Sequence, residues 1–150
     1  MTFFFDQQHR IPLGYSQISL RVERGLDAMI IIYSLLDKHP ASKVCEQFIR
    51  DRTGWFTTTL TLFEAKSILT KVYSIDNALV SQKLEQFARG PITIFEVNLD
   101  TALKSMKMAD TLDIDLTDAV LIQTAQEHGV SYLATDDKKL TRLCYQNIKY

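Results

Sequence analysis

Cysteine, proline and glycine are scarce in this sequence, with two, three and five copies among 150 residues. Cys45 and Cys144 belong to no C-x-x-C or Cys/His pattern, which argues against a zinc-ligand set and a disulfide scaffold, and we expect both thiols to be reduced. The chain also lacks a glycine-rich phosphate loop, a serine in a nucleophile-elbow setting and an apolar run long enough to span a membrane. We therefore expect a cytoplasmic protein without a membrane partner.

An excess of either charge is also missing, because 17 basic side chains balance 18 acidic ones. This balance argues against a protein that coats DNA, but it permits a nucleic-acid enzyme in which a metal ion or a local basic rim meets the phosphates. The length suits one domain, and no linker divides the chain. The first residues, 1–18, have no sustained period, so we expect an N-terminal extension followed by one domain over 19–150.

Apolar periodicity predicts strands that alternate with helices. The predicted strands cover residues 18–22, 55–58, 92–97, 132–134 and 147–149. The predicted helices cover residues 29–36, 41–52, 61–73, 76–88, 100–109 and 115–128, with a helical turn at 138–143. In the helix over 41–52, we expect Val44, Phe48 and Ile49 to face inward. Strands separated by helices favour an α/β fold with a parallel sheet covered on both faces.

Four acidic residues lie beside the apolar runs: Asp27, Glu64, Asp118 and Asp137. A carboxylate next to a core segment is costly to desolvate unless something binds it. In parallel sheets, functional groups collect at the carboxyl ends of the strands, so these acids are expected to converge. Several carboxylates brought together repel one another, and a divalent cation held by oxygen ligands relieves the repulsion. The pattern therefore predicts a magnesium or manganese site.

Each acid, taken alone, also has a simpler explanation as a helix cap. Glu64 ends a Thr-x-x-Glu pattern that is typical of a capping box. Asp115 could be an N-cap, with Asp118 in the favourable first turn of the same helix. Either Asp136 or Asp137 could cap the turn at 138–143. The two explanations are compatible, and the occurrence of four such acids in one small domain favours the metal site.

Three blocks of sequence occur in the order and spacing of a known family. They are Leu-Asp-Ala-Met-Ile-Ile-Ile-Tyr at 26–33, Thr-Thr-Thr-Leu-Thr-Leu-Phe-Glu-Ala at 57–65, and the stretch 118–137 with Asp-Ala-x-x-x-x-Thr-Ala and a closing Thr-x-Asp. Together they resemble the PIN-domain family of metal-dependent ribonucleases, especially the VapC-type toxins of toxin–antitoxin pairs. The resemblance covers roughly residues 20–150.

The resemblance implies a fold, a set of site residues and partners. The fold would be a three-layer α/β/α sandwich with a parallel sheet of about five strands. The residues that would bind Mg²⁺ or Mn²⁺ and catalyse hydrolysis of RNA phosphodiester bonds are Asp27, Glu64, Asp118 and Asp137. Thr135 would support them with its hydroxyl, and Asp115 and Asp136 are candidates for further ligands. The partners would be an RNA substrate, a small antitoxin that fills a hydrophobic groove, and a second copy of the chain.

One position departs from the family pattern. Ala28 and Met29 follow the first aspartate, where a hydroxyl residue and then a small polar residue are common. A missing hydroxyl would weaken the support of the metal site, which leaves a catalytically weakened PIN-like interaction module as the alternative function. A phosphate-accepting receiver domain is disfavoured, because Asp27 has no acidic neighbour.

Overall fold

The computed structural model of the protein describes residues 21–140. The predicted extension at 1–18 and the predicted strand at 147–149 lie outside the described residues. The same is true of most of the strand predicted at 18–22 and of the end of the turn predicted at 138–143.

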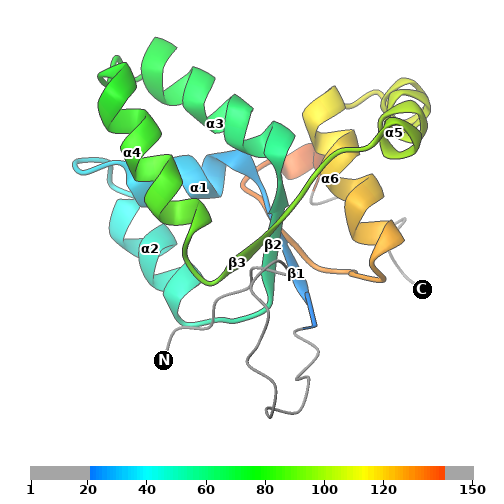
Figure 1. The fold of residues 1–150 in the computed structure, drawn as a ribbon, viewed down its shortest axis with the longest axis horizontal. Helices are drawn as coiled ribbons and strands as arrows, with labels where there is room; N and C mark the ends of the chain where they lie inside the picture. The colour runs from blue at the N-terminus through cyan, green and yellow to red at the C-terminus, as the bar shows by residue number, and fades with distance from the viewer. Residues whose placement is uncertain (1–20, 141–150) are drawn as a thin grey trace, which may run out of the picture.

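A parallel sheet forms the centre of the fold (Figure 1). Its strands run in the order β3-β2-β1-β4, and every neighbouring pair is parallel. They are β1 (Arg24–Leu26), β2 (Trp55–Thr58), β3 (Ile92–Phe95) and β4 (Leu133–Ala134). The predicted parallel sheet is confirmed, with four strands among residues 21–140 where about five were expected for the whole chain.

Helices cover both faces of the sheet (Figure 1). They are α1 (Ala28–Leu35), α2 (Ser42–Arg50), α3 (Thr59–Lys71), α4 (Asn77–Ala88), α5 (Leu99–Leu112) and α6 (Leu116–Glu127). One core joins α1, α3 and α4 to one face of the sheet, with α2 packed against it. A second core joins α6 to the other face around Phe56, Leu121 and Ala125. The three-layer α/β/α sandwich is therefore confirmed, and none of the described helices is long and apolar enough to cross a membrane.

The first described strand lies later in the chain than predicted, at Arg24–Leu26. The alternating apolar pattern that ends at Val22 does not predict this strand. β1 lies between two other strands, and its middle residue is a glycine. A Cβ atom on Gly25 would lie 2.3 Å from Cδ2 of Leu133 and 3.0 Å from Cζ of Phe56. Since contacts this short do not occur, only glycine fits this central position without a shift of its neighbours.

The face of α2 that packs inward also differs from the prediction. Phe48 and Ile49 pack against the core as expected, but Val44 is 70% exposed and Cys45 is buried in its place. On a helix, residues three and four apart share one face. Cys45, Phe48 and Ile49 therefore form the inward face, and Val44 lies outside it.

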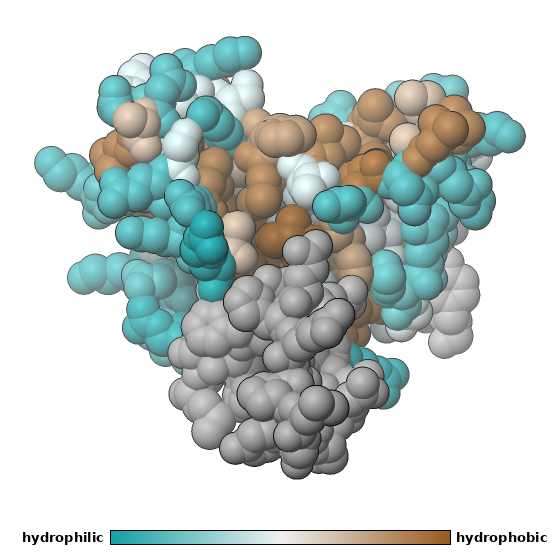
Figure 2. Space-filling view, in the orientation of Figure 1, coloured by the Kyte–Doolittle hydropathy of each residue, from teal (hydrophilic) through white to brown (hydrophobic). Residues whose placement is uncertain are grey.

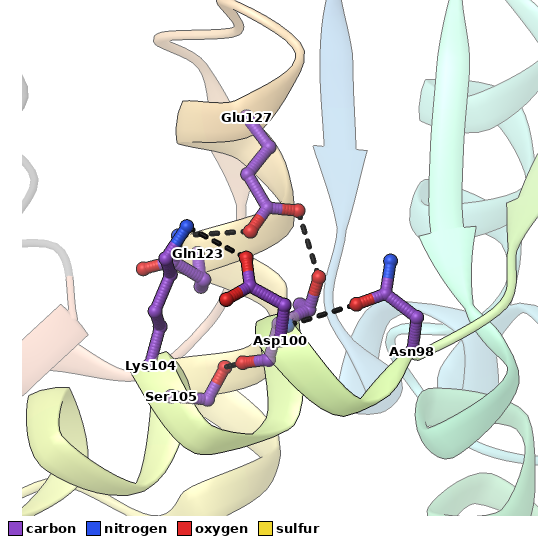
Figure 3. A network of polar contacts seen from close by, with 7 residues as sticks. Asn98, Asp100, Lys104, Ser105, Gln123 and Glu127 are labelled. Carbon is purple, nitrogen blue, oxygen red and sulfur yellow. Dashed lines mark hydrogen bonds and ion pairs between the residues drawn. The ribbon is translucent and has the colours of Figure 1, made fainter.

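A network of polar side chains joins α5 to α6 (Figure 3). Thr101 Oγ1 donates to Oε2 of Glu127 at 2.9 Å, and Gln123 Nε2 donates to Oε1 of the same carboxylate at 3.0 Å. The Asn98 side chain accepts from the backbone N–H of Thr101 at 2.9 Å, which makes Asn98 the N-cap of α5. This network fixes the two helices to each other away from the four predicted acids.

Candidate metal centre

Asp27 directly follows β1 and is the N-cap of α1. Its Oδ1 accepts from the backbone N–H of Ala28 at 2.6 Å, and its Oδ2 accepts from Oγ1 of Thr135 at 2.6 Å. The residue is only 7% exposed. Burial raises the pKa of this carboxyl, while the hydrogen bonds from Thr135 and Ala28 act in the opposite direction. Asp27 is therefore both a helix cap and a buried acid with a fixed orientation.

Thr135 follows β4 and connects two of the predicted acids. Its hydroxyl donates to Asp27 and accepts from the backbone N–H of Asp137 at 3.0 Å. The strands β1 and β4 are neighbours in the sheet, so their carboxyl ends bring these residues together. The hydroxyl that was expected to support the acids is thus in direct contact with the most buried of them.

Glu64 lies on α3 with its side chain half-buried. The predicted capping box of Thr61 and Glu64 is not what starts this helix. Thr58 is the N-cap, and its hydroxyl accepts from the backbone N–H of Thr61 at 3.2 Å. Burial and the charge of Asp27 raise the pKa of Glu64, and a hydrogen bond with Thr117 acts against them. Glu64 is therefore free of a capping role and faces the other acids.

Asp118 is the acid on which the others act most strongly. It lies in the first turn of α6, where the helix dipole favours the ionised form. Its pKa is nevertheless raised to about 7, first by burial and then by the charges of Asp27, Glu64, Asp137 and Asp115. Asp115 occupies the N-cap position of α6, but its side chain makes no capping hydrogen bond. The acids from β1, α3, α6 and the segment after β4 therefore surround one region.

Thr117 was not singled out from the sequence. Its hydroxyl reaches Glu64 from the first turn of α6 and thereby links α6 to α3. The only sequence signal was its position between two acids of the same turn, which alone does not distinguish a supporting hydroxyl from a solvated one.

The adjacent aspartates after β4 have different surroundings. Oδ1 of Asp137 accepts from the backbone N–H groups of Lys139 at 2.7 Å and Leu140 at 3.3 Å, so this residue caps the turn that follows. The charge of Asp137 also raises the pKa of Asp118. Asp136 instead raises the pKa of the Tyr33 hydroxyl on α1. The capping and the clustering explanations both hold for Asp137.

The donor set suits a divalent cation in kind. Carboxylate oxygens are the ligands that Mg²⁺ prefers, and acids whose pKa is raised by one another gain most from a cation between them. Within residues 21–140, however, no three His, Cys, Asp or Glu side chains stand close enough to enclose a metal ion as they lie. The effect of these acids on the pKa of Asp118 indicates that they lie in one region. To bind one ion together, their side chains would have to move closer to one another.

Comparison with known proteins identifies the family. The model of the PIN domain matches residues 26–144, which is most of the chain. The chain therefore belongs to the PIN-domain family, as its three sequence blocks predicted. No curated protein sequence matches it.

Solved structures of low sequence identity share the fold. VapC20 of Mycobacterium tuberculosis, a sarcin–ricin loop cleaving toxin, has a TM-score of 0.71 at 10% identity, over 80% of this chain and 94% of that one. A toxin–antitoxin complex from Klebsiella pneumoniae gives 0.57 at 19% identity, over 78% and 88%. VapBC2 of Rickettsia felis, bound to a promoter DNA fragment, gives 0.56 at 20% identity, over 79% and 91%. The predicted PIN-like fold is confirmed.

Proposed function

We propose that this protein is a metal-dependent endoribonuclease and the toxin of a toxin–antitoxin pair. The observation that carries the proposal is the convergence of acids at the carboxyl end of the sheet, where the Thr135 hydroxyl links Asp27 to the backbone of Asp137. Burial and then the charges of Asp27, Glu64 and Asp137 raise the pKa of Asp118 to about 7, which agrees with this arrangement. Neighbouring acids with perturbed pKa values are typical of functional sites. The family and the VapC-type structural neighbours supply the reaction class and the biological setting.

Mg²⁺ or Mn²⁺ would be held by Asp27, Glu64, Asp118 and Asp137, with Asp115 as a candidate further ligand. When bound, the cation supplies a Lewis acid that makes a water molecule more acidic and stabilises charge on the phosphate. Asp27 contributes a carboxylate whose direction is set by Thr135 and Ala28. Asp118 contributes a carboxyl whose pKa is raised to about 7 by burial and by the neighbouring acids, and a cation beside it would favour its ionised form.

The substrate in this proposal is RNA, in the cytoplasm. Basic side chains near the acids in sequence are the candidates for phosphate contact. Lys66 already binds Oγ of Ser81 at 2.7 Å, and Lys139 is held by Asp113. Lys138 is exposed beside the acids and is the better candidate in the described part of the chain. We expect its replacement by alanine to weaken RNA binding and to reduce the salt dependence of binding.

A second copy of the chain is proposed to bind along α5. Leu99, Leu103 and Met106 lie four and three residues apart on one face, and they are 74%, 51% and 50% exposed. Figure 2 shows hydrophobic side chains exposed around α5 and toward α3. Contiguous exposed apolar surface is typical of a protein interface. Leu103→Glu should therefore yield monomers in light scattering, whereas Gln82→Glu, which adds the same charge at an exposed position of α4, should not.

The antitoxin is proposed to bind the outer face of α2. This face carries an open hollow lined by Lys43, Val44, Gln47, Phe48 and Asp51. Val44 is 70% exposed there and gives the hollow an apolar lining together with Phe48. An apolar segment of an antitoxin could bury it.

The alternative function is a catalytically weakened interaction module. It rests on Ala28 and Met29, which replace the polar residues common in the family. Ala28 is 2% exposed and belongs to the core, and its N–H still binds Asp27. The Thr135 hydroxyl, directly after β4, supports the other oxygen of Asp27, so the supporting contact that the resemblance implies for Thr135 is present. This contact favours an active site.

The test is Mn²⁺ binding by calorimetry together with cleavage of a structured RNA, in the wild type and in Asp27→Asn. We expect both activities in the wild type and neither in the variant. Glu85→Gln is the matched control, because Glu85 is an exposed acid paired with Arg89 on α4. Absence of Mn²⁺ binding by the wild type would contradict the proposal, and binding without cleavage would favour the interaction module.

A further inference from the structure

We infer that Thr57, a buried threonine of β2, is a positioning residue that fixes the backbone of Asp27 through a hydrogen bond to the preceding carbonyl group. The inference rests on the proposed function and deepens it, because it assigns part of the metal affinity to a residue that is not itself a ligand. The sequence does not distinguish this threonine from its neighbours Thr58 and Thr59.

The hydroxyl of Thr57 needs a partner because the residue is fully buried. Its exposed fraction is 0%, and all four residues of β2 are buried. A valine has nearly the same shape and would avoid the cost of burying a hydroxyl group. Oγ1 of Thr57 donates to the backbone carbonyl of Leu26 at 2.8 Å, and Leu26 is also 0% exposed. A buried side chain of β2 is therefore bonded to the last residue of β1.

The bond lies where β1 stops pairing with β2. The last pair in the register of these strands is Gly25 with Phe56, one position before Leu26. Beyond Leu26 the chain leaves the sheet, since Asp27 is the N-cap of α1. The side chain of Thr57 thus continues the contact between the two strands after their backbone pairing has ended.

The peptide unit between Leu26 and Asp27 is thereby held from both sides. Its carbonyl accepts from Thr57 on β2, and its N–H, which belongs to Asp27, donates to the carbonyl of Ala134 on β4 at 3.0 Å. Because a peptide unit is planar, two bonds at its opposite edges leave it little freedom to rotate. The side-chain bonds of Asp27 described above then orient its carboxylate on this fixed backbone. Loss of the Thr57 hydroxyl should free the backbone of Asp27 on the side of β2.

A purely structural role is the competing explanation. A buried bond between two central strands would stabilise the sheet whether or not Asp27 binds a metal ion. Thr124 on α6 supplies a matched comparison, because it is 4% exposed and its hydroxyl donates to the backbone carbonyl of Val120 at 2.7 Å. This bond is of the same kind, but it lies toward the C-terminal end of α6, whereas Asp118 lies in its first turn.

The test measures Mn²⁺ affinity by calorimetry in folded Thr57→Val, Thr57→Ser and Thr124→Val. Thr57→Val should raise the Kd by about tenfold, which is the size of effect expected when the support of a metal ligand is removed. Thr57→Ser keeps the hydroxyl, and Thr124→Val removes a distant one, so both should change the Kd by less than about twofold. Thr57→Ala replaces Thr57→Val if the valine variant does not fold.

Two results would overturn the inference while leaving the proposed function intact. One is an unchanged Mn²⁺ affinity in the variant that lacks the Thr57 hydroxyl, which would make the bond purely structural. The other is a Thr57→Ser variant that binds Mn²⁺ as weakly as Thr57→Val, because the hydroxyl would then not be the cause.

A second measurement does not depend on metal. The carbonyl resonance of Leu26 in nuclear magnetic resonance spectra should shift in Thr57→Val and much less in Thr57→Ser, because only the valine variant loses the bond. An unshifted resonance in Thr57→Val would overturn the bond and the inference with it. Absence of Mn²⁺ binding by the wild type would instead overturn the proposed function, and the positioning role would fall even if the resonance showed that the bond exists.

Discussion

The two ends of α6 treat their carboxylates in opposite ways. Glu127, at the C-terminal end, has built-in partners, because Thr101 and Gln123 donate to its two oxygens. Asp118, at the N-terminal end, lies at the pole of the helix dipole that favours a negative charge. Its pKa is still raised to about 7, because burial and neighbouring acids outweigh the dipole.

The difference separates structure from function along one helix. At Glu127 the chain supplies donors, and the result is a stable junction between α5 and α6. At Asp118 the chain supplies further acids, which cost folding free energy unless a cation is present. A local conflict of this kind is expected where a site is kept for binding. Substitutions at either end of α6 test this difference.

The largest effect is expected at Asp27, the acid that is most fixed. Asp27→Ala should reduce RNA cleavage at least about 100-fold and lower the unfolding free energy by about 1 kcal/mol through loss of the cap. The matched control is Asp76→Ala, which removes a capping carboxylate from α4. It should cost similar stability in urea unfolding but leave cleavage unchanged. Equal cleavage by the two variants would remove Asp27 from the site.

Asp118→Asn should separate stability from activity. With the charge gone, the metal-free variant should be more stable than the wild type by about 1–2 kcal/mol at pH 8, after allowance for solvent screening. Cleavage and the stabilisation by Mn²⁺ should both be lost. Thermal unfolding with and without Mn²⁺ measures this, with the exposed Asp110→Asn on α5 as control. A less stable variant would mean that the carboxylate is a structural cap.

The pH dependence of stability follows from the same group. The folded-state pKa of Asp118, about 7, lies above the ordinary aspartate value of 3.8, so the folded state binds more protons between these values. Metal-free stability should therefore fall as pH rises from about 4 to about 7 and level off above that. The pKa values of Asp27 and Glu64 are raised as well and act in the same direction. Urea unfolding across this range should show a smaller slope in Asp118→Asn and in the presence of Mn²⁺.

At the C-terminal end of α6, Glu127→Ala should lower the free energy of unfolding but leave RNA cleavage unchanged. The buried hydroxyl of Thr101 loses its acceptor, which costs about 1 kcal/mol. RNA cleavage under conditions where the variant is folded should match the wild type. Reduced cleavage by fully folded Glu127→Ala would show that the two ends of the helix are coupled.

The smallest effect is expected at Lys104, whose ion pair with Asp100 measures 2.7 Å and is solvent-exposed. Exposed pairs contribute little to stability. Lys104→Ala should shift the melting temperature by less than about 1 °C, measured beside Glu127→Ala. A larger loss would mean that Lys104 is a working member of the network around Glu127.

The elements with strong local signals could be predicted from the sequence. Trp55–Thr58 is aromatic and β-branched, and it forms β2 over the predicted residues. Asn98 caps α5, and α6 ends at Glu127, two residues before Gly129, whose φ of 65° is the left-handed conformation expected after a helix. The four acids were selected from the sequence because each lies at the edge of an apolar run, and their role as metal ligands stays a prediction.

The contacts that organise the site could not be predicted in this way. Thr135 and Asp27 are 108 residues apart, and only the pairing of β1 with β4 brings them together. Thr58 rather than Thr61 caps α3. Several threonines lie close together in this stretch, and which of them caps the helix depends on where β2 ends. Whether a carboxylate caps a helix, binds a metal ion or does both depends on its neighbours in space, and these cannot be determined from a single sequence.

The tight fit of Gly25 has a practical consequence for the design of a conditional variant of this protein. A Cβ at this position would press on Leu133, at the start of the strand that carries Thr135 to Asp27. Gly25→Ala would therefore loosen the support of Asp27 without changing any acid. Such a change is a rational source of a temperature-sensitive variant, whose activity is low at a higher temperature and returns at a lower one.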